Sequence, residues 1–186
     1  MSLVLPLARL TLTDPRAAAR ALLASGFPRE HHWTVFLLVI SLGGALVAAG
    51  NVIAPPEEGE PYLTGMMAAA FIGASIFLCT GVVMLAGRIF GSRCETADAM
   101  LLVLWLELVS VGVQLVLLVV GFLIPGAAAV LSLVYLFLFV WVLSAFTAEL
   151  HALDGVIRGF IGVVAAALGL AFAIALVQAV LIALAG

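Results

Sequence analysis

The sequence predicts an all-α polytopic membrane protein: a bundle of five transmembrane helices with a short N-terminal interfacial helix. Hydrophobic residues make up 66% of the 186 residues and charged residues only 9%. Soluble domains are roughly half apolar and about a quarter charged. The apolar residues also form runs that are too long for the core helices of a soluble domain, separated by short polar stretches. We therefore expect the bilayer to surround most of the chain.

Five stretches are long enough to cross a membrane, which takes about 20 apolar residues for about 30 Å of hydrocarbon. Little more than Pro125 and Gly126 separates the third from the fourth, and Pro supplies the break. A signal peptide cleaved near Ala49 is a competing interpretation of the first stretch, but that stretch is longer than a usual signal-peptide core. The predicted spans are Trp33 to Ile53, Leu63 to Ala86, Ala99 to Leu123, Gly126 to Phe146 and Ile157 to Leu184.

The arginines predict the orientation. All seven basic residues are Arg, and they lie before the first span, between the second and third, and at the start of the fifth. The other loops, including the acidic segment 55–61, contain no Arg. By the positive-inside rule the N-terminus is cytoplasmic and the C-terminus lies on the far side. Trp33 and Tyr62 would then meet the headgroups, with a cytoplasmic segment 1–32 and a five-span domain 33–186. The arginines are Arg9, Arg16, Arg20, Arg29, Arg88, Arg93 and Arg158.

A short helix is predicted before the first span. Asp14 suits the N-cap, Pro15 suits the first helical position and Gly26 suits the stop. Arg16 and Arg20 lie one turn apart. Two placements remain open: along the cytoplasmic leaflet with Arg toward anionic headgroups, or packed on the protein's own cytoplasmic loops.

Glu107 is the one charged residue well inside a span, and Ser110 and Gln114 share its helix face. Such a carboxyl is a candidate functional group by default, here for a proton or ion relay. The alternative is a buried carboxyl that hydrogen-bonds to its neighbours. A relay usually needs a second ionisable group at membrane depth, and no other span offers one, so the structural role is favoured.

A polar cluster is predicted on the cytoplasmic face. The segment Thr147–Asp154 contains three possible metal ligands, which could form a site with His31 or Glu95. No standard ligand spacing is matched, so the favoured role is to cap helix ends and to pair with arginines, Arg158 included. The cluster consists of His31, Glu149, His151, Asp154, Arg88 and Arg93.

Small residues recur at helix-packing intervals in the last span. They let two helix backbones approach closely in lipid, either within the chain or against a partner. Cys79 and Cys94 are too few for a disulfide framework and are expected to be free thiols. The small residues are Gly155, Gly159, Ala165, Gly169 and Ala173.

Several functions lack the residues that they need. No His lies inside a predicted span, so the paired axial ligands of a membrane haem are missing. Metalloprotease, serine-hydrolase, phosphate-loop and dinucleotide motifs do not occur. The arginines form no basic stripe for nucleic acid. We expect no enzyme activity, no cofactor, no bound metal and no nucleic-acid partner.

Three short motifs resemble bacterial members of the Yip-domain family, named for eukaryotic Ypt/Rab-interacting proteins. They are Thr-Asp-Pro-Arg-Ala at 13–17, Gly-Arg-Ile-Phe-Gly at 87–91 and Glu-Leu-His at 149–151. The resemblance runs from about Thr11 to the end and implies a five-span bundle with a cytoplasmic N-terminus. Eukaryotic members bind small GTPases and shape vesicle traffic, but this chain shows no long cytoplasmic arm, so only the fold is carried over. A chain without Lys, rich in Ala, Leu and Val, is typical of GC-rich bacteria, which suggests the inner membrane.

Two functional hypotheses follow. The first is a non-enzymatic interaction protein, an accessory or assembly subunit or a membrane organiser, whose partners are the lipid bilayer and another membrane protein or a second copy. The alternative is a small transporter or channel component that uses Glu107, Ser110 and Gln114.

Overall fold

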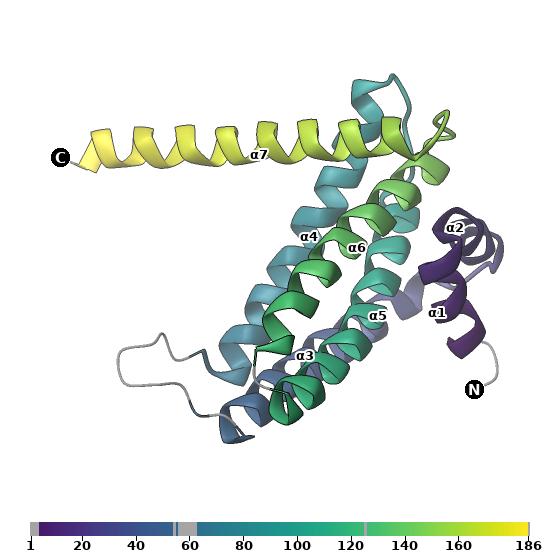
Figure 1. Ribbon diagram of the computed structural model, residues 1–186. Helices are drawn as coiled ribbons and strands as arrows, with labels where there is room; N and C mark the ends of the chain where they lie inside the picture. Colours follow the sequence, from purple (N-terminus) through teal and green to yellow (C-terminus); the bar gives the residue numbers. More distant parts are fainter. Residues whose placement is uncertain (1–3, 54, 56–62, 125, 186) are drawn as a thin grey trace.

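The computed structural model describes residues 4–53, 55, 63–124 and 126–185 (Figure 1). The predicted all-α fold is confirmed, since every regular element in the described residues is helical. In chain order the elements are α1 (Val4–Thr13), α2 (Pro15–Ala24), the 3-10 turn η1 (Arg29–His31), α3 (His32–Ile53), α4 (Gly65–Ile89), α5 (Thr96–Leu123), α6 (Ala127–Leu150) and α7 (Val156–Ala185).

The five predicted spans correspond to helices α3 to α7, each of which is long and apolar enough to cross a bilayer. The helix ends agree with the predicted ends to within a few residues. Gly126 adopts a left-handed conformation (φ +88°) at the N-cap of α6 and so separates α5 from α6. Pro125, to which the sequence assigned this break, lies outside the described residues, as do Tyr62 and most of the acidic segment.

Four of the long helices, α3 to α6, run side by side, whereas α7 crosses the ends of α4 and α6 and projects away from them (Figure 1). Only the first half of α7 packs on the rest of the chain. From Ala167 to Val180 every side chain except that of Leu170 is exposed. Helix α7 therefore offers a long apolar surface that the described part of the chain does not cover.

The N-terminal helix begins as predicted. Asp14 Oδ1 accepts a hydrogen bond from the Ala17 N–H at 3.0 Å, and Pro15 is the first helical residue. The helix stops at Ala24, shortly before the left-handed Gly26. An additional helix, α1, precedes it and was not predicted.

Helix α2 lies on α5 and α6, and α1 packs beside it. Ala18 and Ala19 on α2 are fully buried. Of the two predicted placements, the structure shows packing on the protein itself, but on the helices α5 and α6 and not on the loops that were predicted. We call α1 and α2 together the N-terminal cap.

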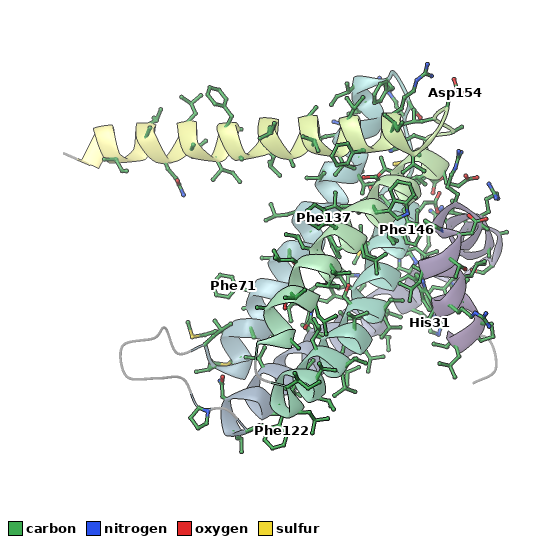
Figure 2. All side chains as sticks on the ribbon, viewed as in Figure 1. His31, Phe71, Phe122, Phe137, Phe146 and Asp154 are labelled. Carbon is green, nitrogen blue, oxygen red and sulfur yellow. The ribbon has the colours of Figure 1, made fainter. Side chains whose placement is uncertain are left out.

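Buried side chains gather at the end of the bundle where α4 ends, α5 begins and α6 ends. We call this the Arg-bearing end, because all the Arg-containing segments meet there. Phe146 is 1% exposed, whereas Phe137 (75%) and Phe122 (68%) are exposed, with Phe122 near the opposite end of the bundle (Figure 2). Such exposed apolar helix surfaces are in contact with lipid.

Candidate functional site

The predicted intramembrane polar face is largely buried. Glu107 is 8% exposed and Ser110 is 1% exposed, while Gln114 is half-buried. The Ser110 hydroxyl donates to the Leu106 carbonyl, one turn earlier, at 2.8 Å. Within the described part of the chain, no basic side chain pairs with Glu107.

Two further residues complete this polar group, and sequence reasoning missed both. The phenol of Tyr135 on α6 lies beside Ser110 and Gln114, and Cys79 on α4 lies near Glu107. Three helices thus contribute polar side chains at membrane depth. A tyrosine in the middle of an apolar run was the available signal, since a phenol buried in lipid needs a partner.

A small cavity lies beside the polar group. The cavity lined by Ser110 and Tyr135 measures about 10 Å³, which is room for one water molecule at most. Cys79 and Cys94 are both free thiols.

Glu149 joins the N-terminal cap to the end of α6. Its Oε2 accepts from Arg16 Nε at 2.8 Å and from Arg20 Nη1 at 3.1 Å. Arg16 Nη2 also donates to the Leu153 carbonyl at 3.4 Å. The two arginines are therefore engaged by the protein itself, which explains why α2 lies against the bundle.

His151 joins α4, the α4–α5 loop and α6. The ring is 5% exposed, with Nε2 3.0 Å from the Val83 carbonyl oxygen and Nδ1 3.1 Å from Ser92 Oγ. Because a carbonyl only accepts, Nε2 carries the proton and Nδ1 accepts from the Ser92 hydroxyl. Burial lowers the pKa of His151 below its usual 6.5, and the hydrogen bond to Val83 partly offsets this. The neutral imidazole is the form that the site holds.

The ring of His151 lies directly on Gly87, where there is no space for a Cβ atom. Two of the three motifs that resemble the Yip-domain family, at 87–91 and 149–151, are therefore in contact. In this structure they join the end of α6 to the end of α4.

The rest of the predicted polar cluster is not brought together. Asp154 forms an exposed ion pair with Arg158 at 2.7 Å, as predicted for that arginine. His31 is exposed on η1, and Arg88 and Arg93 line a separate hollow of about 560 Å³. Among the described residues, no three His, Cys, Asp or Glu side chains are placed to hold a metal ion. The metal site considered from the sequence is thus not assembled here.

The small residues of the last span fall into two groups. Gly155 (φ +89°) precedes α7, and Gly159 packs against Ala148 and the Ser144 carbonyl. Besides Gly159, which was predicted, the helix packs on its neighbours through three residues that were not: Gly162, Val163 and Ala166. The remaining predicted positions are exposed: Ala165, Gly169 and Ala173.

The fold and these contacts define a polytopic α-helical membrane protein with a helical N-terminal cap. The family model described as the Yip1 domain matches residues 9–177, which is nearly the whole chain. The chain belongs to the Yip1 domain family, and the predicted resemblance is confirmed. A comparison with curated proteins and one with solved structures found no match.

Proposed function

We propose that this Yip1-domain protein is a non-enzymatic membrane interaction protein that binds another membrane protein, or a second copy, through α7. One observation carries the proposal: Ala165, Gly169 and Ala173 lie four residues apart on a part of α7 that the chain leaves uncovered. Around Gly169 there is open space where a Cβ would lie. Small residues at this spacing allow a second helix to approach closely in lipid.

The polar residues at the Arg-bearing end support a packing role as well. Glu149 is bound to Arg16 and Arg20, and His151 is bound to Ser92 and Val83. These contacts hold the N-terminal cap on α6 and join the ends of α4 and α6. They stabilise the shape that a membrane partner would recognise.

We also propose that the Arg-bearing end faces the cytoplasm of a bacterial cell and that the C-terminus lies beyond the inner membrane. The support is the positive-inside rule applied to the seven arginines. Reporter fusions after Gly186 and at the N-terminus test it. A periplasm-active reporter should work only at the C-terminus, and the reverse pattern would contradict this orientation.

Two double variants of α7 test the interaction. Ala165→Leu with Gly169→Leu adds bulk to the proposed face, whereas Ala167→Leu with Ala171→Leu adds comparable bulk to the opposite, equally exposed side. We expect the first to abolish copurification of a partner in mild detergent and the second to preserve it. Retention of the partner by both double variants would exclude this face.

A second candidate function, a transporter or channel component, is favoured by the polar groups that surround Glu107 from three helices. It ranks second because the adjacent cavity is only about 10 Å³. Glu107→Gln keeps the shape and the hydrogen-bonding capacity of the side chain. If the wild type carries protons into vesicles and this variant does not, transport is favoured. If neither protein carries protons and the variant still binds its partner, the interaction role is favoured.

A further inference from the structure

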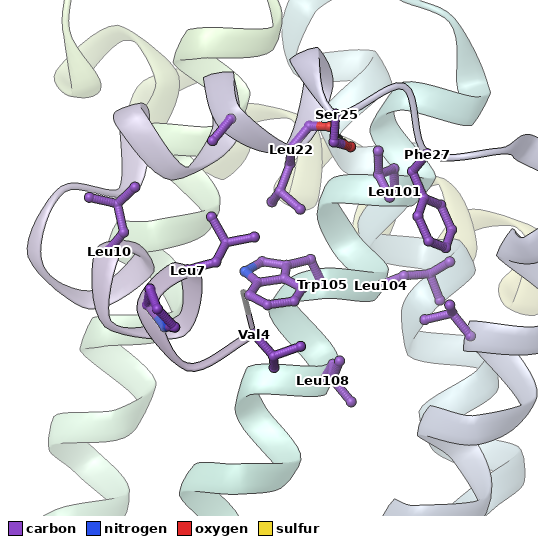
Figure 3. A pocket seen from close by; sticks show the side chains of 13 residues that line it. Val4, Leu7, Leu10, Leu22, Ser25, Phe27, Leu101, Leu104, Trp105 and Leu108 are labelled. Carbon is purple, nitrogen blue, oxygen red and sulfur yellow. Dashed lines mark hydrogen bonds between the residues drawn. The ribbon is translucent and has the colours of Figure 1, made fainter. Parts of the chain in front are cut away.

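An apolar groove runs between the N-terminal cap and helices α3 and α5 (Figure 3). Its volume is about 810 Å³, within the usual range for small-molecule sites. The wall of the groove, which includes Leu7 and Leu108, is almost entirely hydrocarbon. The polar atoms of its Ser25 and Trp105 are already engaged, because Ser25 donates to a backbone carbonyl at 2.6 Å and Trp105 Nε1 donates to Thr11 Oγ1 at 2.9 Å. The groove therefore suits a hydrocarbon chain.

A polar cavity of about 350 Å³ adjoins this groove. Phe27 and Leu101 line both, so the two spaces are neighbours. The charged and titratable residues of the polar cavity are Arg29, His32 and Asp98. The two spaces together form a site with one polar and one apolar part.

His32 indicates that the polar cavity takes a ligand. Its ring is 5% exposed and stacks on Phe27 at a centroid distance of 5.8 Å. Nε2 is buried without a hydrogen-bond partner among the described residues. Arg29 and Asp98 both act electrostatically on the ring. A buried polar group without a partner is costly, and the His32 ring lines the polar cavity, so a ligand in the cavity can pair with it.

The two parts are arranged as a membrane amphiphile requires. Arg29 and His32 lie where α3 begins, at the Arg-bearing end and hence at headgroup level. The groove follows α5 from Leu101 to Leu108, a distance of about 10 Å along the helix axis. The polar part therefore lies near the membrane surface and the apolar part lies deeper.

We propose that groove and cavity bind one phospholipid with a zwitterionic headgroup. The acyl chain lies in the groove, and the phosphate accepts hydrogen bonds from Arg29 and His32. The Asp98 carboxylate accepts from the headgroup ammonium, and Glu95, which forms an ion pair with Arg29, adds a second carboxylate nearby. An anionic headgroup would place no cation against these carboxylates. The site does not involve α7, so the lipid-binding proposal can be wrong or right independently of the proposed function.

Delipidated protein in detergent, titrated with phosphatidylethanolamine or phosphatidylglycerol of identical acyl chains and followed by native mass spectrometry, tests the site. We expect one phosphatidylethanolamine per chain, bound about tenfold more tightly than phosphatidylglycerol. Asp98→Asn should remove most of this preference. His32→Phe keeps the ring that stacks on Phe27 and should weaken both lipids about tenfold.

A matched pair of variants on α2 tests the groove. Ala21 is exposed and lines the groove, while Ala24 is exposed on the same helix outside it. Ala21→Phe should abolish lipid binding and Ala24→Phe should leave it unchanged, with the helical circular dichroism signal preserved in both. Equal lipid binding by the two variants, or no headgroup preference in the wild type, would overturn the proposal. A dimer that dissociates on Ala21→Phe without any bound lipid would show a protein occupant and overturn it as well.

Discussion

The imidazole of His151, just after α6, lies against Gly87 of α4 so closely that only a residue without a side chain can occupy position 87. The same ring is hydrogen-bonded on both nitrogens, to Val83 and to Ser92. One histidine thus joins the end of α6 to the end of α4 and holds the loop between α4 and α5. Its surroundings allow direct tests.

Gly87→Ala should destabilise the protein by about 1–3 kcal/mol, because the added methyl overpacks the contact with His151. Gly81→Ala on the same helix is the control, since a Cβ there meets nothing within 4 Å, and alanine there should be neutral or stabilising. Thermal unfolding in a mild detergent measures both. Equal stability of the two variants would show that the ring does not constrain Gly87.

Acidification should weaken the fold through His151. Burial lowers the pKa of this residue in the folded protein, so the unfolded chain binds a proton more readily. The contribution of neutral His151 to the free energy of unfolding is fully present above about pH 6.5. It is lost as the pH falls through 6.5 toward the pKa of His151 in the folded protein. Melting temperatures recorded between pH 8 and pH 5 should decline more for the wild type than for His151→Gln. Parallel curves would contradict this account.

Glu149→Gln should loosen the N-terminal cap, because it removes the charge that binds both Arg16 and Arg20. We expect a loss of about 1 kcal/mol and faster amide hydrogen exchange in residues 4–24. Asp154→Asn, which removes the exposed pair with Arg158, is the control and should leave exchange in the cap unchanged. A cap that exchanges at the wild-type rate in Glu149→Gln would show that apolar packing alone holds it.

Trp105 and Thr11 should be energetically coupled through their hydrogen bond. Thr11 is fully buried, so Thr11→Val leaves the indole N–H of Trp105 unpaired. The variants Thr11→Val and Trp105→Phe and their combination form a double-mutant cycle, with an expected coupling of about 1 kcal/mol. Additive effects on unfolding would indicate that the bond contributes nothing.

Features that depend on neighbours in the sequence were predictable. Hydropathy located the five long helices, and Asp14 with Pro15 located the start of α2. Helix α1 was missed because it is a short apolar stretch with Pro6 near its start, although proline is tolerated in a first helical turn.

Features that depend on how helices meet were not predictable in the same way. His151 and Gly87 lie far apart in the sequence, and neither is unusual by itself. Likewise, Gly162 rather than Ala165 packs on α4, because the rotation of α7 about its axis is set by tertiary contacts and not by spacing. Tyr135 joins the group around Glu107 only once α5 and α6 are side by side.

Helix α7 is proposed to bind a partner. The native mass of the wild-type particle, extracted from its own membrane in mild detergent, tests this together with identification of whatever copurifies. We expect a stoichiometric companion, either a second membrane protein or a second copy, that is lost in the Ala165→Leu, Gly169→Leu double variant. A particle with the mass of one chain and no companion would contradict it.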